Sequence, residues 1–183
     1  MPSAGTRVEI GIREAADADL ASLLDIVNRE IETSAYVWGE VPKTMDERRA
    51  WLSAHHSADL PVLVATKGDA VVGWASLSRF RAASGYRFTA EVSVYVAATH
   101  RSHGVARRLV ASLEQSARPR AIRSLIAVVD CANEPSIRLF RRFGYAEAGR
   151  LKDIGRKFGE WRSEVFLVKR LARPQARETP AIA

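Results

Sequence analysis

Residues 91–118, EVSVYVAATHRSHGVARRLVASLEQSAR, contain the change of pattern from which the architecture of this chain follows. The segment 91–96 alternates and is rich in β-branched and aromatic residues, which is typical of a mostly buried strand. Apolar residues then recur at helical spacing from residue 109, so Gly104 stands where a helix is predicted to begin. A helix N-terminus offers unpaired N–H groups and a partial positive charge, and small residues at Gly104 and Ala106 let an anion approach. The stretch therefore predicts a strand, a glycine turn with a phosphate or pyrophosphate site, and a helix.

Length and composition predict one folded domain. The chain has 183 residues, of which 47% are hydrophobic, and this fits a single core over residues 10–171. Residues 1–9 are expected to be a loose N-terminus and residues 172–183 a disordered tail. No run approaches the ~18 apolar residues of a membrane span, and the first ten residues lack the apolar region of a signal peptide. The lone Cys131 excludes an internal disulfide, so we expect a cytoplasmic protein without a membrane partner.

The charge of the chain is unevenly distributed. The net charge is +7, but residues 1–99 carry 10 basic and 13 acidic side chains, whereas residues 100–170 carry 16 basic and 7 acidic ones. The basic half contains the predicted phosphate turn. A basic face suits nucleic acid or a polyanionic cofactor such as coenzyme A, and the sequence has no helix-turn-helix, RRM or zinc pattern to favour nucleic acid.

The remaining elements follow from periodicity and capping. A strand is expected near residues 9–14, then a helix over residues 20–31 with Asp17 as its N-cap, and a second helix opened by the capping box Thr44–Glu47. Residues 62–66 and 70–77 indicate an antiparallel hairpin. A buried strand at 125–129 precedes a helix capped by Asn133. Strands at 145–151 and 162–171 are then expected on either side of a loop at 157–161.

Several spaced motifs resemble one enzyme family. Arg101-x-x-Gly104-x-Ala106 after a strand, with Asn133 opening another helix, resembles the acyl-CoA-binding core of the GCN5-related N-acetyltransferases (GNAT). The segments that resemble its phosphinothricin N-acetyltransferase branch are Gly85-Tyr86-Arg87, Glu91-x-Ser93-Val94-Tyr95-Val96, Asn133-x-x-Ser136-Ile137 and Lys157-Phe158-Gly159-x-Trp161. The resemblance extends from about residue 10 to residue 171, which is nearly the whole chain.

The resemblance implies an α/β (α+β) GNAT fold. In that fold a mixed, mostly antiparallel, twisted sheet carries helices on both faces, and its central strands splay open after the strand 91–96. Acetyl-CoA is the implied co-substrate, and in this fold Asn133 both caps its helix and bonds the cofactor. The residues expected to bind acetyl-CoA are Val94, Tyr95, Val96, Arg101, Ser102, His103, Gly104, Val105, Ala106, Arg107 and Asn133.

Glu91 is the candidate catalytic residue. An acceptor amine is protonated at neutral pH and has no lone pair for attack, so a base must remove the proton. A carboxylate in an apolar strand is costly unless it is paired, and partial desolvation raises its pKa toward the working pH. The alternative is a buried salt bridge with Arg81 or Arg87. The resemblance favours the base, because the family's acceptor-side glutamate falls at this position.

The acceptor site is expected around the segment before the central strand. Arg79 is interpreted as part of a solvated loop, whereas Arg81 falls where the phosphinothricin-type enzymes carry an arginine facing the acceptor. Paired hydrogen bonds from a guanidinium suit a carboxylate or phosphinate. Trp38 lies in an aromatic loop that is either a core plug or a wall of the acceptor site, and the resemblance favours the wall. The expected acceptor residues are therefore Trp38, Arg81, Ser84, Gly85, Tyr86 and Glu91.

The remaining chemistry is less complete in the sequence. A backbone N–H of Tyr95 or of its neighbour is expected to stabilise the charge that develops on the thioester oxygen. Phe140 departs from the family pattern, because the wider family often has tyrosine there and the phosphinothricin branch has histidine. Solvent or another residue must then protonate the leaving thiolate. A covalent route through Cys131 is disfavoured because no histidine indicates a triad, and no metal is predicted.

The sequence thus predicts an acetyl-CoA-dependent N-acetyltransferase. Its expected acceptor is the α-amino group of a small amino-acid-like compound, such as phosphinothricin, methionine sulfoximine or methionine sulfone, attacked directly in a ternary complex. The alternatives are acetylation of a protein N-terminus or other amine and, more distantly, a basic nucleic-acid-binding module. A homodimer paired through the loop 157–161 is expected from the resemblance.

Overall fold

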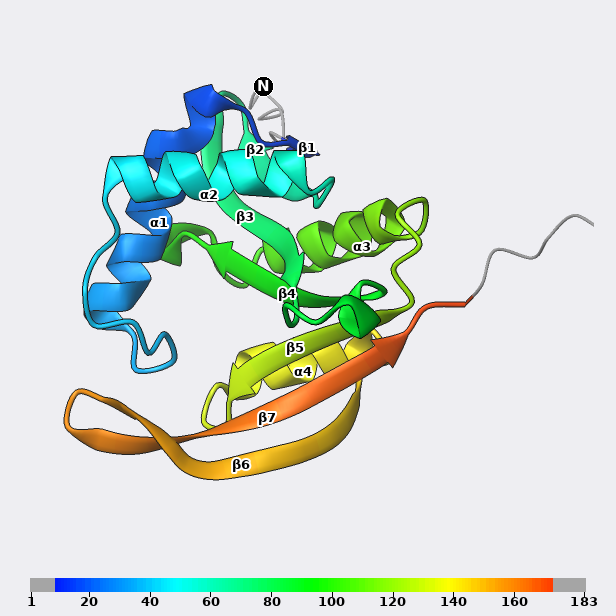
Figure 1. The fold of residues 1–183 in the computed structure, drawn as a ribbon. Helices are drawn as coiled ribbons and strands as arrows, with labels where there is room; N and C mark the ends of the chain where they lie inside the picture. The colour runs from blue at the N-terminus through cyan, green and yellow to red at the C-terminus, as the bar shows by residue number, and fades with distance from the viewer. Residues whose placement is uncertain (1–8, 173–183) are drawn as a thin grey trace, which may run out of the picture.

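One seven-stranded sheet connects the whole of the computed structural model, which describes residues 9–172 (Figure 1). The strands are β1 (Ile10–Glu14), β2 (Val62–Lys67), β3 (Ala70–Arg79), β4 (Thr89–Val96), β5 (Ser124–Asp130), β6 (Ala146–Lys157) and β7 (Glu160–Arg170), in the spatial order β1-β2-β3-β4-β5-β7-β6. All neighbouring strands pair antiparallel except for the β4–β5 pair, which is parallel. The predicted mixed, mostly antiparallel sheet is confirmed. The expected loose ends fall almost entirely on residues 1–8 and 173–183, which lie outside the described residues.

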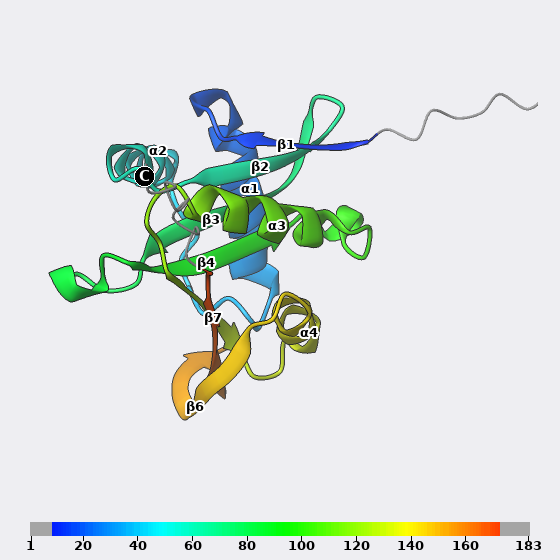
Figure 2. The same cartoon turned by 90° about the vertical axis from the view of Figure 1, so that its right-hand side faces the viewer.

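Helices lie on both faces of the sheet, as predicted. They are α1 (Leu20–Thr33), α2 (Met45–Ser57), α3 (Val105–Ala117) and α4 (Glu134–Arg142). The apolar sides of α1 and α2 pack with Trp74 of β3 in one core, and those of α3 and α4 pack in a second core on the opposite face. Figure 2 shows α2 and α3 on opposite sides of the strands β2 to β4. Among the described residues, α4 is the helix that packs against β5 and β7, and no helix covers their second face (Figure 1).

The helix starts depend on short-range hydrogen bonds. Thr44 Oγ1 accepts the N–H of Glu47 at 3.2 Å, and the Glu47 carboxylate accepts the N–H of Thr44 at 2.7 Å, which confirms the capping box. Asn133 Oδ1 accepts the N–H of Ser136 at 3.3 Å. The prediction that Asp17 caps the first helix was wrong. Asp17 begins a 3₁₀ turn over Asp17–Asp19, and the carboxylate of Asp19 accepts the N–H of Ala16 at 2.8 Å.

The central strands separate earlier than expected. β4 pairs with β5 only from Thr89 to Glu91, although β4 continues to Val96. The splay therefore begins at Glu91, within the strand, and not after its last residue. The edge of β4 beyond Glu91 has no strand beside it, and this opening positions the site described below.

The segment 157–161 is a tight turn and not a loop. β6 and β7 extend to Lys157 and from Glu160, leaving only Phe158 and Gly159 between them. Lys157 is buried, and its Nζ donates to the carbonyl of Ile31 at 2.6 Å and to the carbonyl of Gly39. The ammonium thus links the hairpin tip to the end of α1 and to the following loop, and these bonds offset part of the cost of burying its charge.

Candidate active site

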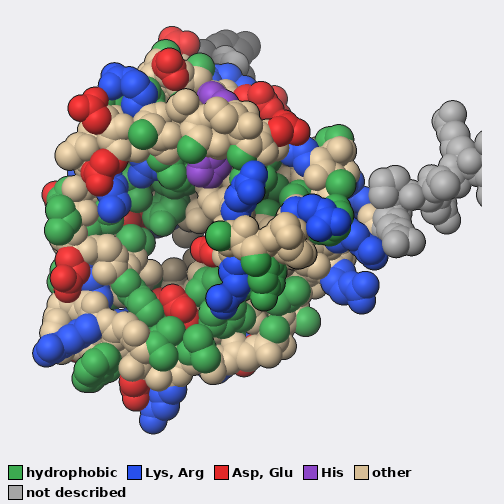
Figure 3. Space-filling view, in the orientation of Figure 1, with side chains coloured by type: hydrophobic (Ala, Val, Ile, Leu, Met, Phe, Trp, Pro, Cys, Tyr) green, Lys and Arg blue, Asp and Glu red, His purple; other side chains and the backbone are tan. Residues whose placement is uncertain are grey.

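The splayed strands open a cleft of about 740 Å³. The open edge of β4, the turn before α3 and one side of α4 form its walls, together with the end of α1 and the start of the loop that follows it. Figure 3 shows the molecule hollowed at this level, with mostly hydrophobic side chains and some acidic ones around the opening. The predicted residues that line the cleft are Glu91, Val94, Tyr95, Val96, Arg101, Ser102, Gly104, Val105, Ala106, Arg107 and Asn133.

The turn before α3 is built to receive an anion. Gly104 is the N-cap with φ +79°, a left-handed conformation that an L side chain rarely adopts. The first bond into the helix runs from the N–H of Arg108 to the carbonyl of Gly104 at 3.1 Å. The amides of Val105, Ala106 and Arg107 consequently have no acceptor within the helix. These three donors and the helix dipole fit a pyrophosphate such as that of acetyl-CoA.

The basic side chains near this turn have different roles. The guanidinium of Arg101 pairs with Glu30 of α1, and its Nε donates to the carbonyl of Val96 at 3.3 Å. His103 does not line the cleft, and its Nδ1 lies 2.6 Å from the carbonyl oxygen of Arg101. Two arginines that sequence reasoning missed, Arg138 and Arg142 of α4, do line it. Their i,i+4 spacing within the basic half was the signal that could have identified them.

The open edge of β4 presents backbone amides to the cleft. The N–H of Ala97 bonds the carbonyl of Val72 in β3 at 3.0 Å, and amides alternate along a strand. Tyr95 therefore directs its N–H toward β3, whereas Val94 and Val96 direct theirs toward the gap left by β5. Of the two possibilities that the sequence left open, the neighbours of Tyr95 are the ones placed to bond an oxygen in the cleft.

Glu91 stands where the strands separate. Its side chain is partly buried, and burial raises the pKa of the carboxyl above its ordinary value. Within residues 9–172 it forms no ion pair, since Arg87 donates to the carbonyl of Ser84 at 3.2 Å and Arg81 lies over the rings of Phe80 and Tyr86. The alternative salt bridge thus has no partner among the described residues.

A network of fixed polar contacts lies at the far end of β5, four residues beyond the Ile126 that pairs with Glu91. Both oxygens of the Asp130 carboxylate bond Arg162 at 2.8 Å, and Trp38 Nε1 donates to Asp130 at 2.9 Å. The Trp38 ring packs against Gly155, where an added Cβ would lie 2.3 Å from the ring. Trp38 does not line the cleft. It instead fixes the loop after α1 to β5, which is closer to a structural plug than to an acceptor wall.

Glu164 of β7 is a second half-buried carboxyl near this network. Its pKa is raised by burial and by the charges of Glu91 and Asp130. Sequence reasoning missed this residue, because the register that sets Glu164 opposite Asp130 cannot be read from either strand alone.

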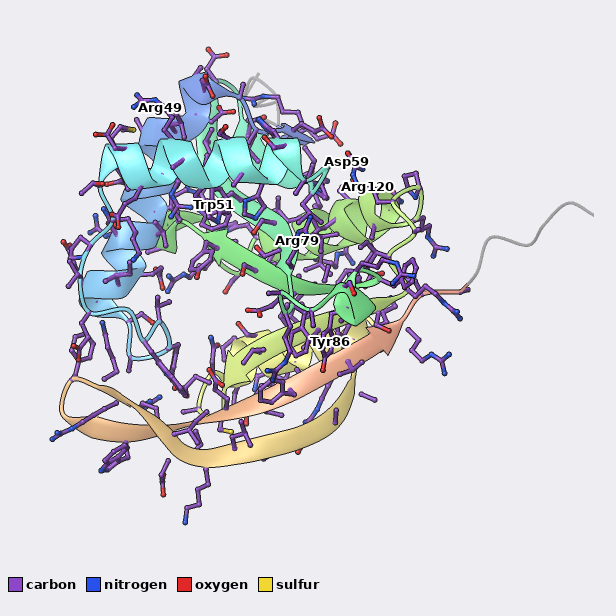
Figure 4. All side chains as sticks on the ribbon, in the orientation of Figure 1. Arg49, Trp51, Asp59, Arg79, Tyr86 and Arg120 are labelled. Atoms are coloured by element: carbon purple, nitrogen blue, oxygen red, sulfur yellow. The ribbon has the colours of Figure 1, made fainter. Side chains whose placement is uncertain are left out.

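The expected acceptor residues are divided between two places. Arg81, Ser84 and Tyr86 line a separate pocket of about 160 Å³, shared with Asp59 and Arg120, and Gly85 lines neither cavity. Figure 4 shows Asp59 and Arg120 near the right-hand end of α2, Arg79 below them near the centre and Tyr86 lower still, all to the right of Trp51. The structure therefore does not bring Arg81 and Glu91 into one cavity.

Phe140 stands at the position where the sequence lacks the proton donor of the family pattern. Its ring meets the ring of Tyr145 edge-on, with 5.1 Å between centroids, and Tyr145 is buried in the core. Burial raises the pKa of the Tyr145 hydroxyl. Tyr145 does not line the cleft, so it does not replace the missing acid.

Comparisons with known proteins agree with this geometry. Residues 26–145 match the model described as Acetyltransferase (GNAT) family. The chain is 34% identical over 157 residues to an L-methionine sulfoximine/L-methionine sulfone acetyltransferase of Pseudomonas paraeruginosa, covering 85% of this chain and 91% of the relative.

Two solved structures are similar to this chain. One is a phosphinothricin acetyltransferase from Sinorhizobium meliloti in complex with acetyl-CoA, with a TM-score of 0.87 and 28% identity over 94% of this chain and 95% of that one. The other is a ribosomal-protein-alanine N-acetyltransferase from Brucella melitensis, with a TM-score of 0.86 and 41% identity over 88% of this chain and 99% of that one. Among the described residues, no helix is long and apolar enough to cross a membrane.

Proposed function

This chain belongs to the acetyltransferase (GNAT) family, and from that premise we propose that it acetylates the α-amino group of a small amino-acid-like acceptor with acetyl-CoA. The acceptor class is that of methionine sulfoximine, methionine sulfone and phosphinothricin, on which similar enzymes act. The observation that carries the proposal is the meeting in one cleft of the open β4 edge, the phosphate turn and the carboxyl of Glu91, which forms no ion pair within residues 9–172. Residues 10–171 act as one catalytic domain in this proposal.

The cofactor side would be held mainly by backbone groups. The amides of Val105, Ala106 and Arg107 bind the pyrophosphate, and Asn133 bonds the pantetheine arm. The amides of Val94 and Val96 point into the cleft, so they would stabilise the negative charge that develops on a thioester oxygen held there. When bound, acetyl-CoA supplies the activated acetyl group.

Glu91 would act as the general base. Burial raises the pKa of Glu91, which makes its carboxylate a stronger base toward the proton of the acceptor ammonium, directly or through water. The free amine then attacks without a covalent enzyme intermediate. With Phe140 in place of a donor, solvent protonates the departing thiolate.

An acceptor screen tests this proposal. Purified protein is incubated with acetyl-CoA and a panel of amino acids and analogues, and free thiol release is monitored. We expect turnover with methionine sulfone, methionine sulfoximine or phosphinothricin. Absence of turnover with every free amino acid, with retained acetyl-CoA binding, would remove the acceptor assignment.

A second candidate acceptor is a protein N-terminus. The 41% identity to a ribosomal-protein-alanine N-acetyltransferase favours it. Peptides beginning with alanine, included in the same screen, distinguish the two. A kcat/KM for such a peptide well above that for every free amino acid would replace the first candidate with the second.

We also propose that the protein is a cytoplasmic homodimer. The β6–β7 hairpin exposes Leu151, Ile154, Phe158 and Trp161, of which Trp161 is 65% exposed, and large apolar surfaces of this kind favour protein contacts. Light scattering at micromolar concentration should give twice the chain mass, and Trp161→Ser should shift it toward the monomer. A monomeric wild-type protein would refute the dimer.

A further inference from the structure

A buried arginine on α2 has no anionic partner in the described part of the chain. Arg48 is 6% exposed, and its guanidinium makes no hydrogen bond or ion pair with any residue between 9 and 172. It lies over two aromatic rings, with Cζ 4.5 Å from the centroid of Trp51 and 5.2 Å from that of Trp74. Cation–π contacts offset only part of the cost of burying a charge, and buried charges in proteins are normally paired. A bound anion would therefore balance the buried charge of Arg48.

Two further buried donors on β3, one of them on the Trp74 ring beside Arg48, are also without a partner among the described residues. Trp74 Nε1 and Ser76 Oγ are buried and, like Arg48 Nε, bond no group in the described part of the chain. Trp74 and Ser76 are two residues apart on β3, so their side chains share one face of the sheet. Arg48 and Trp74 can only donate hydrogen bonds, and a serine hydroxyl can donate as well. A ligand with acceptor oxygens fits this set, and a cation does not.

This face of the sheet is continuous with the site of Glu91. Trp74, Ser76 and Ser78 of β3 stand directly opposite Tyr95, Ser93 and Glu91 of β4, and paired residues project to the same side. The rings of Trp74 and Tyr95 stack with 4.5 Å between centroids, and Tyr95 lines the cleft. The charges of Arg48 and Glu91 both act on the Tyr95 hydroxyl, whose pKa is raised mainly by burial. Arg48, Trp74 and Ser76 are not among the residues that line the cleft. The guanidinium instead adjoins the Trp74–Tyr95 stack, on the same face of the sheet as Glu91, and Tyr95 lies between it and the cleft.

We propose that Arg48 binds the α-carboxylate of the acceptor, so that the α-amino group is directed toward Glu91. The inference rests on the proposed function. Its guanidinium provides the charge-assisted, paired hydrogen bonds that a carboxylate accepts best. Arg81, which is exposed in the small separate pocket, then has no role in binding this carboxylate.

The test pairs a change in the enzyme with a change in the acceptor. L-Methionine sulfone, its α-carboxamide and L-methionine are compared as acceptors for the wild type, Arg48→Met and the control Arg49→Met. Arg49 is the adjacent arginine but is exposed and points away from the sheet (Figure 4). Methionine is chosen because its unbranched side chain still packs on the two tryptophan rings.

Arg48→Met should lower kcat/KM for both carboxylate acceptors by about 10- to 100-fold, the range of a charged hydrogen bond. The same variant should change kcat/KM for the carboxamide less than about threefold, and the dissociation constant of acetyl-CoA should not change. Arg49→Met should behave as the wild type with all three acceptors.

An equal loss with all three acceptors would show a structural role and overturn the proposal. A loss of kcat/KM with methionine sulfone but not with L-methionine would also overturn it, and so would wild-type kcat/KM values in Arg48→Met. If Arg48→Met does not fold, Arg48→Lys replaces it, with a smaller loss that is again confined to the carboxylate acceptors. Failure of the proposed function itself is distinct, because the wild type would then acetylate none of the three.

Discussion

The turn before α3 and the wall beneath α2 are two anion-receptive regions that differ in how they are built. The turn is one continuous segment, residues 101–107, and its donors are backbone amides left free by the start of a helix. The wall combines Arg48 of α2 with Trp74 of β3 and Glu91 of β4, and its properties depend on the burial of side chains. The cofactor side should thus respond to backbone geometry, and the acceptor side to the loss of single charged groups.

Glu91→Gln should produce the largest effect, on the acceptor side alone. We expect kcat to fall by roughly 100- to 10,000-fold at neutral pH, the usual range for a general base, and to recover partly at high pH where free amine is abundant. Because burial raises the pKa of Glu91, the wild-type rate should rise with pH as Glu91 ionises, at a pH above the ordinary pKa range of a carboxyl. The variant should lack this rise. Steady-state pH profiles measure this, with exposed Glu40→Gln as the control. Wild-type turnover of Glu91→Gln at every pH would return Glu91 to a structural role.

Arg81→Ala asks whether the small pocket belongs to the acceptor side at all. Because Arg81 lines a pocket separate from the cleft of Glu91, we expect the KM of the acceptor to change by less than about threefold; a rise of roughly 10- to 100-fold, about 1.5–3 kcal/mol for a charged hydrogen bond, would show that this pocket belongs to the acceptor site. The KM of acetyl-CoA should stay constant. Arg79→Ala is the matched control, because Arg79 lines the same pocket and is expected to be solvated. Loss of acetyl-CoA affinity in Arg81→Lys, with the acceptor KM unchanged, would assign the small pocket to the cofactor side.

Lys157→Met tests how far the acceptor side depends on long-range contacts. The substitution leaves the carbonyls of Ile31 and Gly39 without their donor, so we expect a loss of about 1–3 kcal/mol in the free energy of unfolding. Urea denaturation measures it, and Lys152→Met, at an exposed residue, is the control. The acceptor KM should rise with no change in acetyl-CoA binding. Unchanged stability would mean that the cost of burying the ammonium cancels its two hydrogen bonds.

Gly104→Val tests the cofactor side through backbone geometry. A valine at φ +79° costs roughly 1–2 kcal/mol, and relaxation of the turn would misplace the free amides. We expect acetyl-CoA to bind about tenfold more weakly, since about 1.4 kcal/mol is a factor of ten. Gly68→Val is the matched control, because Gly68 also has a positive φ, +59°, but lies in the β2–β3 turn. Calorimetry that shows unchanged affinity in folded Gly104→Val would contradict the pyrophosphate assignment.

The smallest expected effect is a gain in stability from Glu91→Gln. The raised pKa means that the folded state holds the proton of Glu91 more tightly than the unfolded state does. This contribution to stability is present at low pH and is lost as the pH rises through the folded pKa. Glu91→Gln should consequently melt at a slightly higher temperature than the wild type at pH 7, and the difference should vanish below about pH 4, where the carboxyl is protonated in both states. A difference independent of pH would point to packing and not to ionisation.

Sequence alone determined the features whose hydrogen bonds close within a few residues. The capping box at Thr44, the Asn133 cap and the turn at Gly104 are of this kind, because each is fixed by side-chain type and backbone freedom at adjacent positions. Hydrophobic periodicity gave the strands and helices, and the joint motifs gave the family. The wrong prediction of Asp17 as a cap also concerned local structure. Two aspartates stand close together in the sequence, and only the path of the backbone decides that the carboxylate of Asp19 accepts the N–H of Ala16.

Tertiary structure decided which of the predicted site residues meet. Arg101 pairs with Glu30, 71 residues away, and Trp38 bonds Asp130, 92 residues away. Strand register decides that the opening begins at Glu91 and that Val94 and Val96 face it. The burial of Arg48 is set by two tryptophans from different elements. Such contacts depend on the packing of distant segments, and no local pattern encodes the distance between two charged groups that only the folded sheet brings together.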